Sequence, residues 1–306
     1  MNLLVTSTSF SQKPREKIQR LKDFNVIYNK KGRSYSKKEI IGLLKMYDPI
    51  GIIAGTEKYD ADVLSYCKNL KVISRVGVGL DSINLLECKK RRILVKNTPS
   101  APTNAVAEMV IGQMINLARR MQESNNNLKR KIWEKHIGKE IRNSAIGIIG
   151  CGRIGSSVFY KLLGFKPKQI IVNDILVKKA KALKKGKFAS KEKIVKNCDV
   201  ITIHIPLNKK NKNYITKKEL DLMKKDVILL NFSRGGIINE KDLYNWLKKN
   251  PEAGVALDTF ENEPYKGKLI KLSNCYLTPH MGSYSGKSRL DMEIKAVNNL
   301  IKFLPI

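Results

Sequence analysis

Acidic residues and histidines are scarce in this chain. Asp and Glu number 27 against 59 Lys and Arg, which gives a formal net charge of +32 at pH 7, and there are three histidines. Such a charge is typical of proteins that bind nucleic acid. Lysine is nevertheless spread over the whole chain, and runs such as 178–179 and 184–185 fall on predicted helix faces or loops. We therefore do not expect nucleic-acid binding. The positive field instead favours small anionic substrates, whose association slows as salt is added.

Other signals are missing as well. The five cysteines show no CxxC spacing, which argues against a zinc site or a disulfide framework. No apolar run approaches the length of a membrane span, and residues 1–7 lack the basic lead of a secretion signal. We expect a protein with no metal and no membrane contact, with free thiols in a reducing cytoplasm.

The length and the pattern of apolar residues predict two α/β domains. A chain of 306 residues is long enough for two cores. Strands are expected at 3–5, 26–28, 50–54, 72–74 and 93–95, and helices at 14–21, 37–46 (with Ser36 as N-cap), 61–67 and 83–90. A long helix starts at 104, with a stripe of Val106, Val110, Met114, Leu117 and Met121. A polar arm with Trp133 follows it. A second βαβ series covers 145–280. The last helix, with Ile294, Val297, Ile301 and Leu304 on one face, is expected to return to the first domain.

A glycine pattern lies at the start of the second series. The string AIGIIGCGRIG at 145–155 contains Gly150, Gly152 and Gly155 in the spacing GxGxxG, after an apolar strand and before a helix expected at 156–163. In that context Gly150 permits a tight turn, Gly152 lets the backbone approach a pyrophosphate, and Gly155 lets helix and strand pack closely. The free N–H groups of the helix N-terminus favour the phosphates of a dinucleotide.

An aspartate marks the end of the next predicted strand, 170–173. Asp174 can accept hydrogen bonds from a ribose 2′-hydroxyl and would repel a 2′-phosphate, so the sequence predicts NAD as the cofactor in preference to NADP. Read without the glycine pattern, Asp174 is equally an ordinary helix cap or turn residue.

Charged side chains follow three further apolar runs. Arg234 comes after 227–230, Asp258 and Glu263 follow 254–257, and His280 follows 275–277. Strand ends of a parallel sheet meet at one edge, where open α/β sheets bind ligands. An arginine can hold an anion there, and a histidine with a carboxylate can move a proton. Each of these residues alone could be a surface ion-pair partner, a turn residue or a packed histidine; together they favour a functional site.

These motifs, in this order, resemble one enzyme family. They include ISRVGVGLD at 73–81, NTP at 97–99 with AVAE at 105–108, the glycine string, DVITIHIPL at 199–207 and the three charged strings. The chain resembles the D-isomer-specific 2-hydroxyacid dehydrogenases over nearly its whole length, most of all their 3-phosphoglycerate dehydrogenase branch. The resemblance implies a Rossmann-type doubly wound parallel sheet plus a second, flavodoxin-like α/β substrate domain, with the active site in the cleft between them. The substrate domain would comprise 1–100 and 283–306, and the NAD-binding domain 101–282.

The resemblance also implies roles for single residues. Arg234 would grip the substrate carboxylate, His280 would exchange a proton with the substrate oxygen, Glu263 would hydrogen-bond that histidine, and Asp258 would face the nicotinamide. The implied cofactor-binding residues are Thr103, Gly150, Gly152, Arg153, Ile154, Gly155, Asp174, His204, Pro206, Ser233, Arg234, Asp258, His280 and Gly282. The chain departs from the usual family pattern at Ile175, where proline is common, and in the lysine- and asparagine-rich stretch 208–213.

The substrate is a separate inference. The resemblance gives backbone N–H groups around Val76 and Gly77 to the substrate carboxylate, and Arg75 beside them could neutralise a phosphate, unless it pairs with an acid of its own domain. This favours oxidation of 3-phosphoglycerate to 3-phosphohydroxypyruvate, with glyoxylate or hydroxypyruvate reduction as the alternative. A non-enzymatic NAD-sensing protein, similar to corepressors that share this fold, is the hypothesis from another class, and the positive charge is what favours it. We also expect a homodimer, formed through the helix and arm at about 104–140.

Overall fold

The computed structural model describes residues 1–8, 10 and 19–304. The chain divides into two compact units, and each is described by itself below. Unit 1 consists of Met1–Pro102 and Tyr284–Ile306, and unit 2 of Thr103–Ser283. The predicted helix at 14–21 lies mostly outside the described residues.

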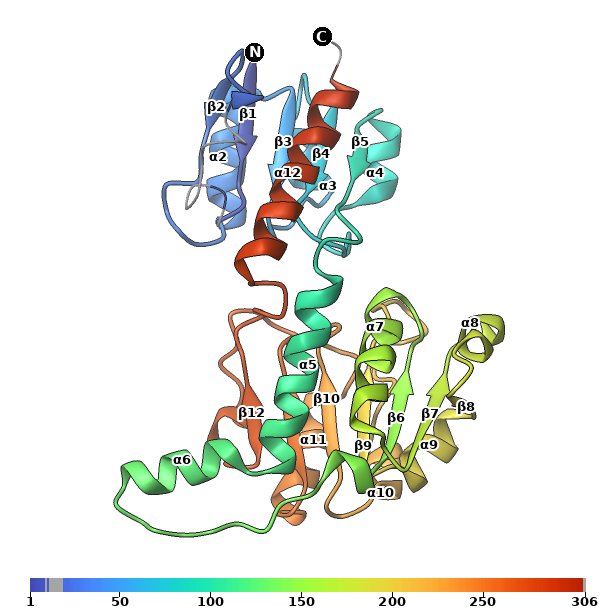
Figure 1. The fold of residues 1–306 in the computed structure, drawn as a ribbon. Coiled ribbons are helices and arrows are strands. Elements are labelled where there is room, and N and C mark those ends of the chain that lie inside the picture. Colours follow the sequence, from blue (N-terminus) through green and yellow to red (C-terminus); the bar gives the residue numbers. More distant parts are fainter. Residues whose placement is uncertain (9, 11–18, 305–306) are drawn as a thin grey trace. The chain divides into compact units, whose positions relative to one another are not determined.

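Unit 1 is built on a parallel sheet of five strands in the order β2-β1-β3-β4-β5 (Figure 1). This is the strand order of the flavodoxin-like folds, so the predicted class of this unit is confirmed. Its strands are β1 (Asn2–Val5), β2 (Asn25–Ile27), β3 (Gly51–Ala54), β4 (Val72–Arg75) and β5 (Leu94–Lys96). Its helices are α2 (Lys37–Tyr47), α3 (Ala61–Ser65), α4 (Leu85–Lys90) and α12 (Gly286–Phe303).

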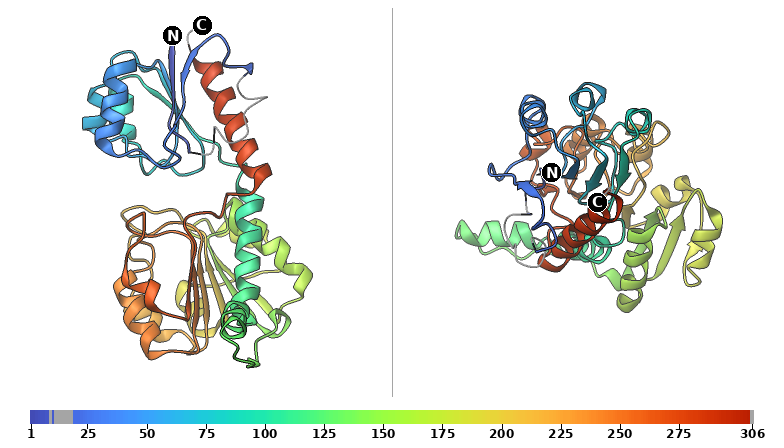
Figure 2. Two further views of the ribbon diagram at one scale, coloured as in Figure 1. Left: turned by 90° about the vertical axis from the view of Figure 1, so that its left-hand side faces the viewer. Right: turned by 90° about the horizontal axis from the view of Figure 1, so that it is seen from above.

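Successive side chains of these strands point alternately to the two faces of the sheet and form two separate hydrophobic cores. Leu4 and Ile52 pack with α2, α3 and α4 on one face, whereas Leu3 and Ile53 pack with α12 on the other. Successive side chains of a strand point to opposite faces, so a strand covered on both faces must be apolar throughout. Figure 2 shows α12 on the face opposite to the other helices. The last helix therefore returns to the first sheet, as the sequence predicts.

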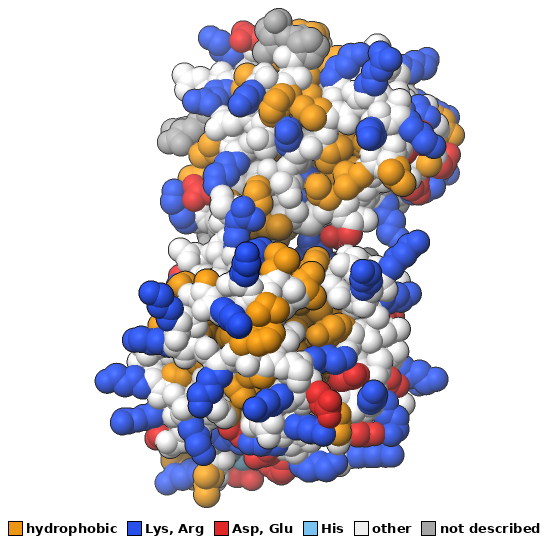
Figure 3. Space-filling view, turned by 90° about the vertical axis from the view of Figure 1, so that its right-hand side faces the viewer, with side chains coloured by type: hydrophobic (Ala, Val, Ile, Leu, Met, Phe, Trp, Pro, Cys, Tyr) orange, Lys and Arg blue, Asp and Glu red, His pale blue; other side chains and the backbone are white. Residues whose placement is uncertain are grey.

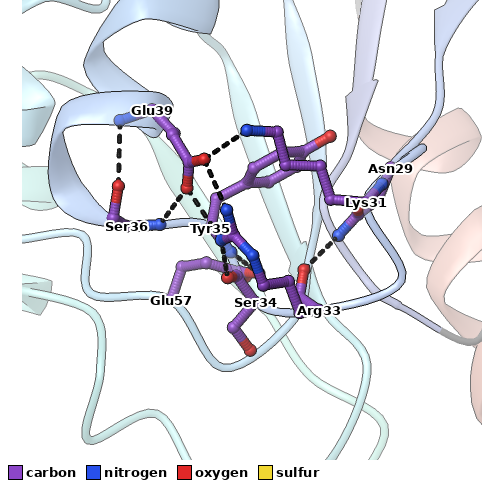
Figure 4. Close-up of polar contacts among 8 residues, drawn as sticks. All are labelled: Asn29, Lys31, Arg33, Ser34, Tyr35, Ser36, Glu39 and Glu57. Carbon is purple, nitrogen blue, oxygen red and sulfur yellow. Dashed lines mark hydrogen bonds and ion pairs between the residues drawn. The ribbon is translucent and has the colours of Figure 1, made fainter.

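The start of α2 is fixed by a capping box. The Ser36 side chain accepts from the Glu39 N–H, and the Glu39 carboxylate accepts from the Ser36 N–H, which confirms Ser36 as the N-cap. Figure 4 shows the Glu39 carboxylate between this backbone N–H and the side chains of Lys31 and Arg33. These two cations and the Ser36 N–H hold the pKa of Glu39 well below its usual range. The cluster is exposed, and its role is to order the loop before α2.

Unit 2 is built on a parallel sheet of seven strands in the order β12-β11-β10-β9-β6-β7-β8. The strands are β6 (Ala145–Ile149), β7 (Gln169–Asn173), β8 (Lys187–Phe188), β9 (Val200–Ile203), β10 (Ile228–Asn231), β11 (Gly254–Leu257) and β12 (Cys275–Leu277). The helices are α5 (Thr103–Ala118), α6 (Met121–Lys129), α7 (Arg153–Leu162), α8 (Val177–Ala182), α9 (Lys191–Asn197), α10 (Lys217–Leu222) and α11 (Glu240–Lys249), with 3-10 turns η1 (Ile141–Asn143), η2 (Leu163–Phe165) and η3 (Lys268–Lys271).

Helices cover both faces of this second sheet (Figure 2). One core joins the strands to α9, α10 and α11, and the other joins them to α5, α7 and α8. The chain runs from β6 outward through β7 to β8, then returns to β9 on the other side of β6 and continues to β12. This is the predicted doubly wound arrangement. The strand order reverses between β6 and β9, and ligands of such folds bind outside that point.

Two predicted helices differ from those observed. α5 ends at Ala118, and Arg120 adopts a left-handed conformation with φ 49°, so Met121 begins α6 with 54% of its surface exposed. The prediction that Met121 continues the buried stripe of α5 is therefore wrong. In α12 the fully buried positions include Met292, Ala296 and Leu300 alongside the predicted Val297, whereas Ile294 and Ile301 lie half-buried at the edge of that face.

Within the described residues, no helix combines the length and the apolar character required to cross a membrane. All five cysteines are buried and free. Their burial raises the pKa of each thiol, for Cys151 to about 11 and for Cys198 to about 12, so these thiols stay protonated and pack as small apolar groups.

Candidate active site

Six strands of unit 2 end at one edge of the sheet. Their pairing aligns six strand ends in register: Ile149, Asn173, Ile203, Asn231, Leu257 and Leu277. The residue that follows each of these ends is therefore delivered to the same edge. The predicted residues Gly150, Asp174, His204, Asp258 and, slightly further along their loops, Arg234 and His280 all follow these ends.

His280 and Glu263 form a hydrogen-bonded pair. His280 Nδ1 lies 2.8 Å from Glu263 Oε2, and the other oxygen, Oε1, accepts from the Phe260 N–H at 3.1 Å. A carboxylate can only accept, so Nδ1 carries the proton and Nε2 of the neutral ring keeps a lone pair. About a third of the His280 side chain (35%) is exposed, which leaves the ring accessible. The arrangement is that of a general base whose tautomer is fixed by a carboxylate.

Electrostatics keep the Glu263 carboxyl ionised. Burial would raise its pKa, but the hydrogen bond with His280, the charge of His280 in its protonated form, the Phe260 N–H and the charge of Arg234 together lower it below the usual range. Arg234 is thus close enough to act on the same carboxylate, and its Nη1 donates to the Ser233 carbonyl at 2.7 Å. The structure therefore brings together in unit 2 the arginine, glutamate and histidine that the sequence singled out.

The loop that carries Arg234 is held by a residue that the sequence reasoning missed. The Asn231 side chain donates to the Arg234 carbonyl at 2.8 Å and accepts from the Ser233 N–H and hydroxyl. Gly235 brings this loop against the next one, because a Cβ at 235 would lie 1.9 Å from the Phe260 carbonyl carbon. Only glycine fits there. The signal for Gly235 was the Arg-Gly-Gly string itself, whereas no pattern marks Asn231.

The glycine loop after β6 has the geometry of a dinucleotide cradle. Gly150 has φ +99°, and a Cβ there would meet the His204 carbonyl oxygen at 2.6 Å. A Cβ at Gly155 would lie 1.9 Å from the Gly150 carbonyl oxygen, so this glycine permits the close approach of α7. Gly152, by contrast, faces open space, and α7 begins at Arg153 and Ile154 with no side-chain cap. Open backbone at an uncapped helix N-terminus fits a bound pyrophosphate, so these residues fit NAD.

Asp174 contacts this same loop. Its Oδ2 accepts from the Cys151 N–H at 2.7 Å and its Oδ1 from the Leu176 N–H at 2.8 Å. An ionised carboxylate has about four acceptor sites, so two remain for a ribose. Directly after it, Ile175 is 95% exposed and Leu176 53% exposed. These two exposed apolar side chains beside the glycine loop were not predicted as part of the site. The only sign of them in the sequence was the departure from proline at position 175.

His204 lies under the glycine loop, where burial lowers its pKa to about 3. Its Nε2 lies 2.9 Å from Thr202 Oγ1, and its Nδ1 is buried without a partner in the described part of the chain. Pro206 and Ser233 follow the ends of β9 and β10, and Thr103 begins α5. No cluster of three or more His, Cys, Asp or Glu suited to a metal ion occurs among the described residues.

In unit 1, the turn after β4 differs from the prediction in one respect. The Val76 N–H donates to the Ala54 carbonyl and the Gly77 N–H to Thr98 Oγ1, so neither is available to a substrate. Within the described residues, the N–H groups of Val78 and Gly79 donate to no protein acceptor. The N–H groups of 76 and 77 are thus already used within the protein, and those of 78 and 79 are the donors at this turn that a ligand can use. Arg75 donates to the Val76 carbonyl, and its guanidinium lies across Gly77.

Comparison with known proteins decides the family. Residues 111–282 match the model of the NAD-binding domain of D-isomer specific 2-hydroxyacid dehydrogenases. The chain belongs to this family. It is 34% identical to the glyoxylate reductase of Thermococcus litoralis, over 81% of this chain and 78% of that protein. It is 33% identical to the D-3-phosphoglycerate dehydrogenase of Archaeoglobus fulgidus, over 89% of this chain. The chain spans about half (53%) of that longer relative.

Solved structures give the same result for the fold. The D-lactate dehydrogenase of Aquifex aeolicus, complexed with NAD and lactic acid, superimposes with a TM-score of 0.83 at 27% identity, covering 99% of this chain and 95% of that one. The TT0316 protein of Thermus thermophilus gives a TM-score of 0.86 at 28% identity, with 98% and 96% covered. The expected family, fold class and NAD-binding domain are thus confirmed.

Proposed function

We propose that this protein transfers hydride between NAD and a D-2-hydroxy acid, with His280 as its acid-base group. The observation that supports this most is the hydrogen bond between His280 and Glu263, which lies at the same sheet edge as Arg234 and the glycine loop. A proton-transfer group, an anion-binding cation and a dinucleotide cradle are the parts that the reaction of this family requires.

The residues divide the chemistry between them. Nε2 of neutral His280 accepts the hydroxyl proton of the 2-hydroxy acid, and the ionised Glu263 stabilises the imidazolium that forms. In the opposite direction the imidazolium returns this proton to the oxygen of a 2-keto acid. Arg234 can hold the substrate carboxylate with two parallel hydrogen bonds, which fixes the orientation of the reacting carbon. Bound NAD supplies the hydride acceptor.

We assign the cofactor contacts to the loops of unit 2. The N–H groups at Gly152, Arg153 and Ile154 would bind the pyrophosphate, and the remaining acceptor sites of Asp174 would bind the ribose hydroxyls, where a 2′-phosphate would be repelled. The exposed apolar side chains of Ile175 and Leu176 can pack against the adenine. This assignment expects NAD to be preferred over NADP.

For the substrate we propose 3-phosphoglycerate, and within unit 1 we assign the N–H groups of Val78 and Gly79 as donors to a substrate anion. Arg75 supports this choice because its guanidinium is fixed beside that turn and can pair with a phosphate. The rival substrates are glyoxylate and hydroxypyruvate, since relatives with those names match the chain as well as the phosphoglycerate dehydrogenases do.

A panel of assays tests both the proposed reaction and the proposed substrate. Reduction of 3-phosphohydroxypyruvate, hydroxypyruvate and glyoxylate is followed by the loss of NADH absorbance, and repeated with NADPH. We expect the phosphorylated substrate to react best, with kcat/KM for it falling roughly 10- to 100-fold in Arg75→Ala. Faster reaction of the unphosphorylated acids would reject the substrate and keep the reaction class. No oxidation of NADH by any 2-keto acid would reject the function.

We also propose a homodimer formed through α6 and the arm 130–140. This segment exposes Leu128, Ile132, Trp133 and Ile137, of which Trp133 is 81% and Ile137 99% exposed. Large apolar side chains gathered on one arm are typical of an interface. Sedimentation equilibrium at micromolar concentration should show a dimer, and a monomer in Trp133→Ala; a monomeric wild-type protein would contradict the proposal.

A further inference from the structure

Asp258 is buried against the turn that carries His280. It is 2% exposed, and its carboxylate accepts three hydrogen bonds from the segment 278–282. Oδ1 accepts from the Thr278 hydroxyl at 2.6 Å and from the Met281 N–H at 2.8 Å, and Oδ2 accepts from the Gly282 N–H at 2.8 Å. The donors lie on both sides of His280 in the sequence, so the carboxylate holds both ends of its turn.

His280 needs such support because its own backbone is left-handed, with φ 51°. Non-glycine residues adopt this conformation rarely, and it persists only where the surroundings enforce it. Asp258 and Glu263 belong to the same loop after β11, five positions apart. Glu263 binds the ring of His280, whereas Asp258 binds the backbone on which the ring is mounted. The two carboxylates thus fix the same residue at two points.

We propose that Asp258 is a positioning residue that sets the orientation and the tautomer of His280 through the backbone of residues 278–282; this inference rests on the proposed role of His280 as acid-base group. It differs from the expected role of Asp258 as a residue that faces the nicotinamide. Oδ1 accepts two of the bonds and Oδ2 the third, so both oxygens are engaged within the protein.

We call Asp258 and its three hydrogen bonds to residues 278–282 the clamp. Its chemistry requires a carboxylate. Its three partners are two backbone N–H groups and a hydroxyl, all of which donate, and only a group with two accepting oxygens satisfies them. An asparagine side chain would turn an NH₂ donor toward an N–H donor and break one end of the clamp. Burial raises the pKa of Asp258, and the bonds from Thr278, Met281 and Gly282 oppose that rise.

Two variants test the clamp, with a neighbour as control. Asp258→Asn removes one acceptor. Gly282→Ala keeps the carboxylate but places a Cβ 2.9 Å from Oδ2, which must shift. Thr259→Val changes the adjacent buried residue, whose hydroxyl has no hydrogen-bond partner within the described part of the chain. Thr259→Val should therefore leave His280 as it is in the wild type.

The readout is the tautomer of His280, followed by ¹⁵N NMR of the imidazole rings in the protein without substrate. The three histidines make the spectrum simple, and His280→Gln assigns the signal. We expect Nδ1 to be protonated in the wild type and in Thr259→Val. In Asp258→Asn and Gly282→Ala we expect a mixture of tautomers, with kcat lower by about 100-fold, and in Asp258→Asn we expect unchanged affinity for NADH.

The possible outcomes distinguish a failure of the proposed role of Asp258 from a failure of the proposed function. An unchanged His280 tautomer in both variants, with weaker NADH binding, would overturn the clamp and return Asp258 to the cofactor. A changed tautomer in a protein that oxidises no 2-hydroxy acid would uphold the clamp and reject the proposed function instead. If Asp258→Asn does not fold, Gly282→Ala decides alone.

Discussion

At the scale of single residues, His280 has an unusual backbone conformation at the place where the chemistry is proposed. The left-handed backbone of His280 costs about 1–2 kcal/mol for a residue with a Cβ. It is retained because the His280 N–H donates to the Thr278 carbonyl at 2.9 Å and the ring is bound to Glu263. Strain of this kind is typical of functional sites. The sequence singled out the residues that we propose for the site, but not the turn that presents His280, because a turn of this kind has no signature in residue type.

At the same scale, the burial of His204 leads to a prediction of how the free energy of unfolding depends on pH. Its pKa in the folded protein is lowered from 6.5 to about 3 by burial, so the unfolded chain binds a proton that the folded chain does not. Stability is then lost as pH falls below about 6.5, by at most about 1.4 kcal/mol per pH unit. Urea unfolding between about pH 7 and 5, above the range in which exposed carboxylates titrate, measures this slope.

The comparison with His204→Gln isolates that residue. Glutamine does not titrate, so the variant should show a smaller decrease of unfolding free energy over the same range of pH. Equal slopes in the two proteins would mean that His204 titrates normally in the folded state and is hydrated.

At the scale of elements, the strands and their ends were the most predictable features. Apolar runs bounded by glycines and polar residues gave the strand ends of unit 2 because a strand buried on both faces must be continuously apolar. The end of α5 was missed, since its apolar spacing continues through Met121 although the backbone turns at Arg120. Likewise, the substrate donors were placed at 76 and 77, because a sequence does not show that Ala54 and Thr98 already accept those N–H groups.

At this scale we predict the effect of replacing Gly235 with alanine. Alanine there would force a Cβ to within 1.9 Å of the Phe260 carbonyl carbon, so the loops after β10 and β11 must separate and Arg234 must move from Glu263. We expect a lower melting temperature and a loss of turnover of roughly 100-fold or more, since a displacement of about 1 Å can cost that much. Differential scanning calorimetry and the NADH assay measure the two effects.

Gly164→Ala is the matched control in the same unit, because a Cβ at 164 meets nothing within 4 Å. Its melting temperature and turnover should stay near those of the wild type. A Gly235→Ala variant that behaves like Gly164→Ala would show that the two loops do not have to touch.

At the scale of the whole molecule, the sequence predicted the fold class, the family and the NAD-binding domain, because their motifs extend over most of the chain. The charge is less informative. Figure 3 shows Lys and Arg side chains scattered over the face drawn, with acidic and apolar side chains between them, and no single basic patch. On that face the distribution is the one expected of a general compositional excess of lysine. It does not favour the corepressor-like alternative.

The site also depends on the whole sheet, since its groups come from loops after β6, β10, β11 and β12 that share one edge. The role of Asn231, which holds the loop after β10, could not be predicted, and neither could that of Thr98 in unit 1, which accepts from the Gly77 N–H. Asn231 binds groups of residues 233 and 234, and Thr98 binds one that is 21 residues away, and in neither case does residue type reveal the contact. Residue type and spacing identify the side chains proposed for the chemistry. The residues that hold those side chains in place can be identified only from the structure.

The most direct test of the account is the turnover of His280→Ala, measured with saturating 2-keto acid and NADH alongside the affinity for NADH. If His280 is the acid-base group, kcat falls at least about 100-fold while NADH binds as tightly as in the wild-type protein. Near-normal turnover in this variant would contradict the account.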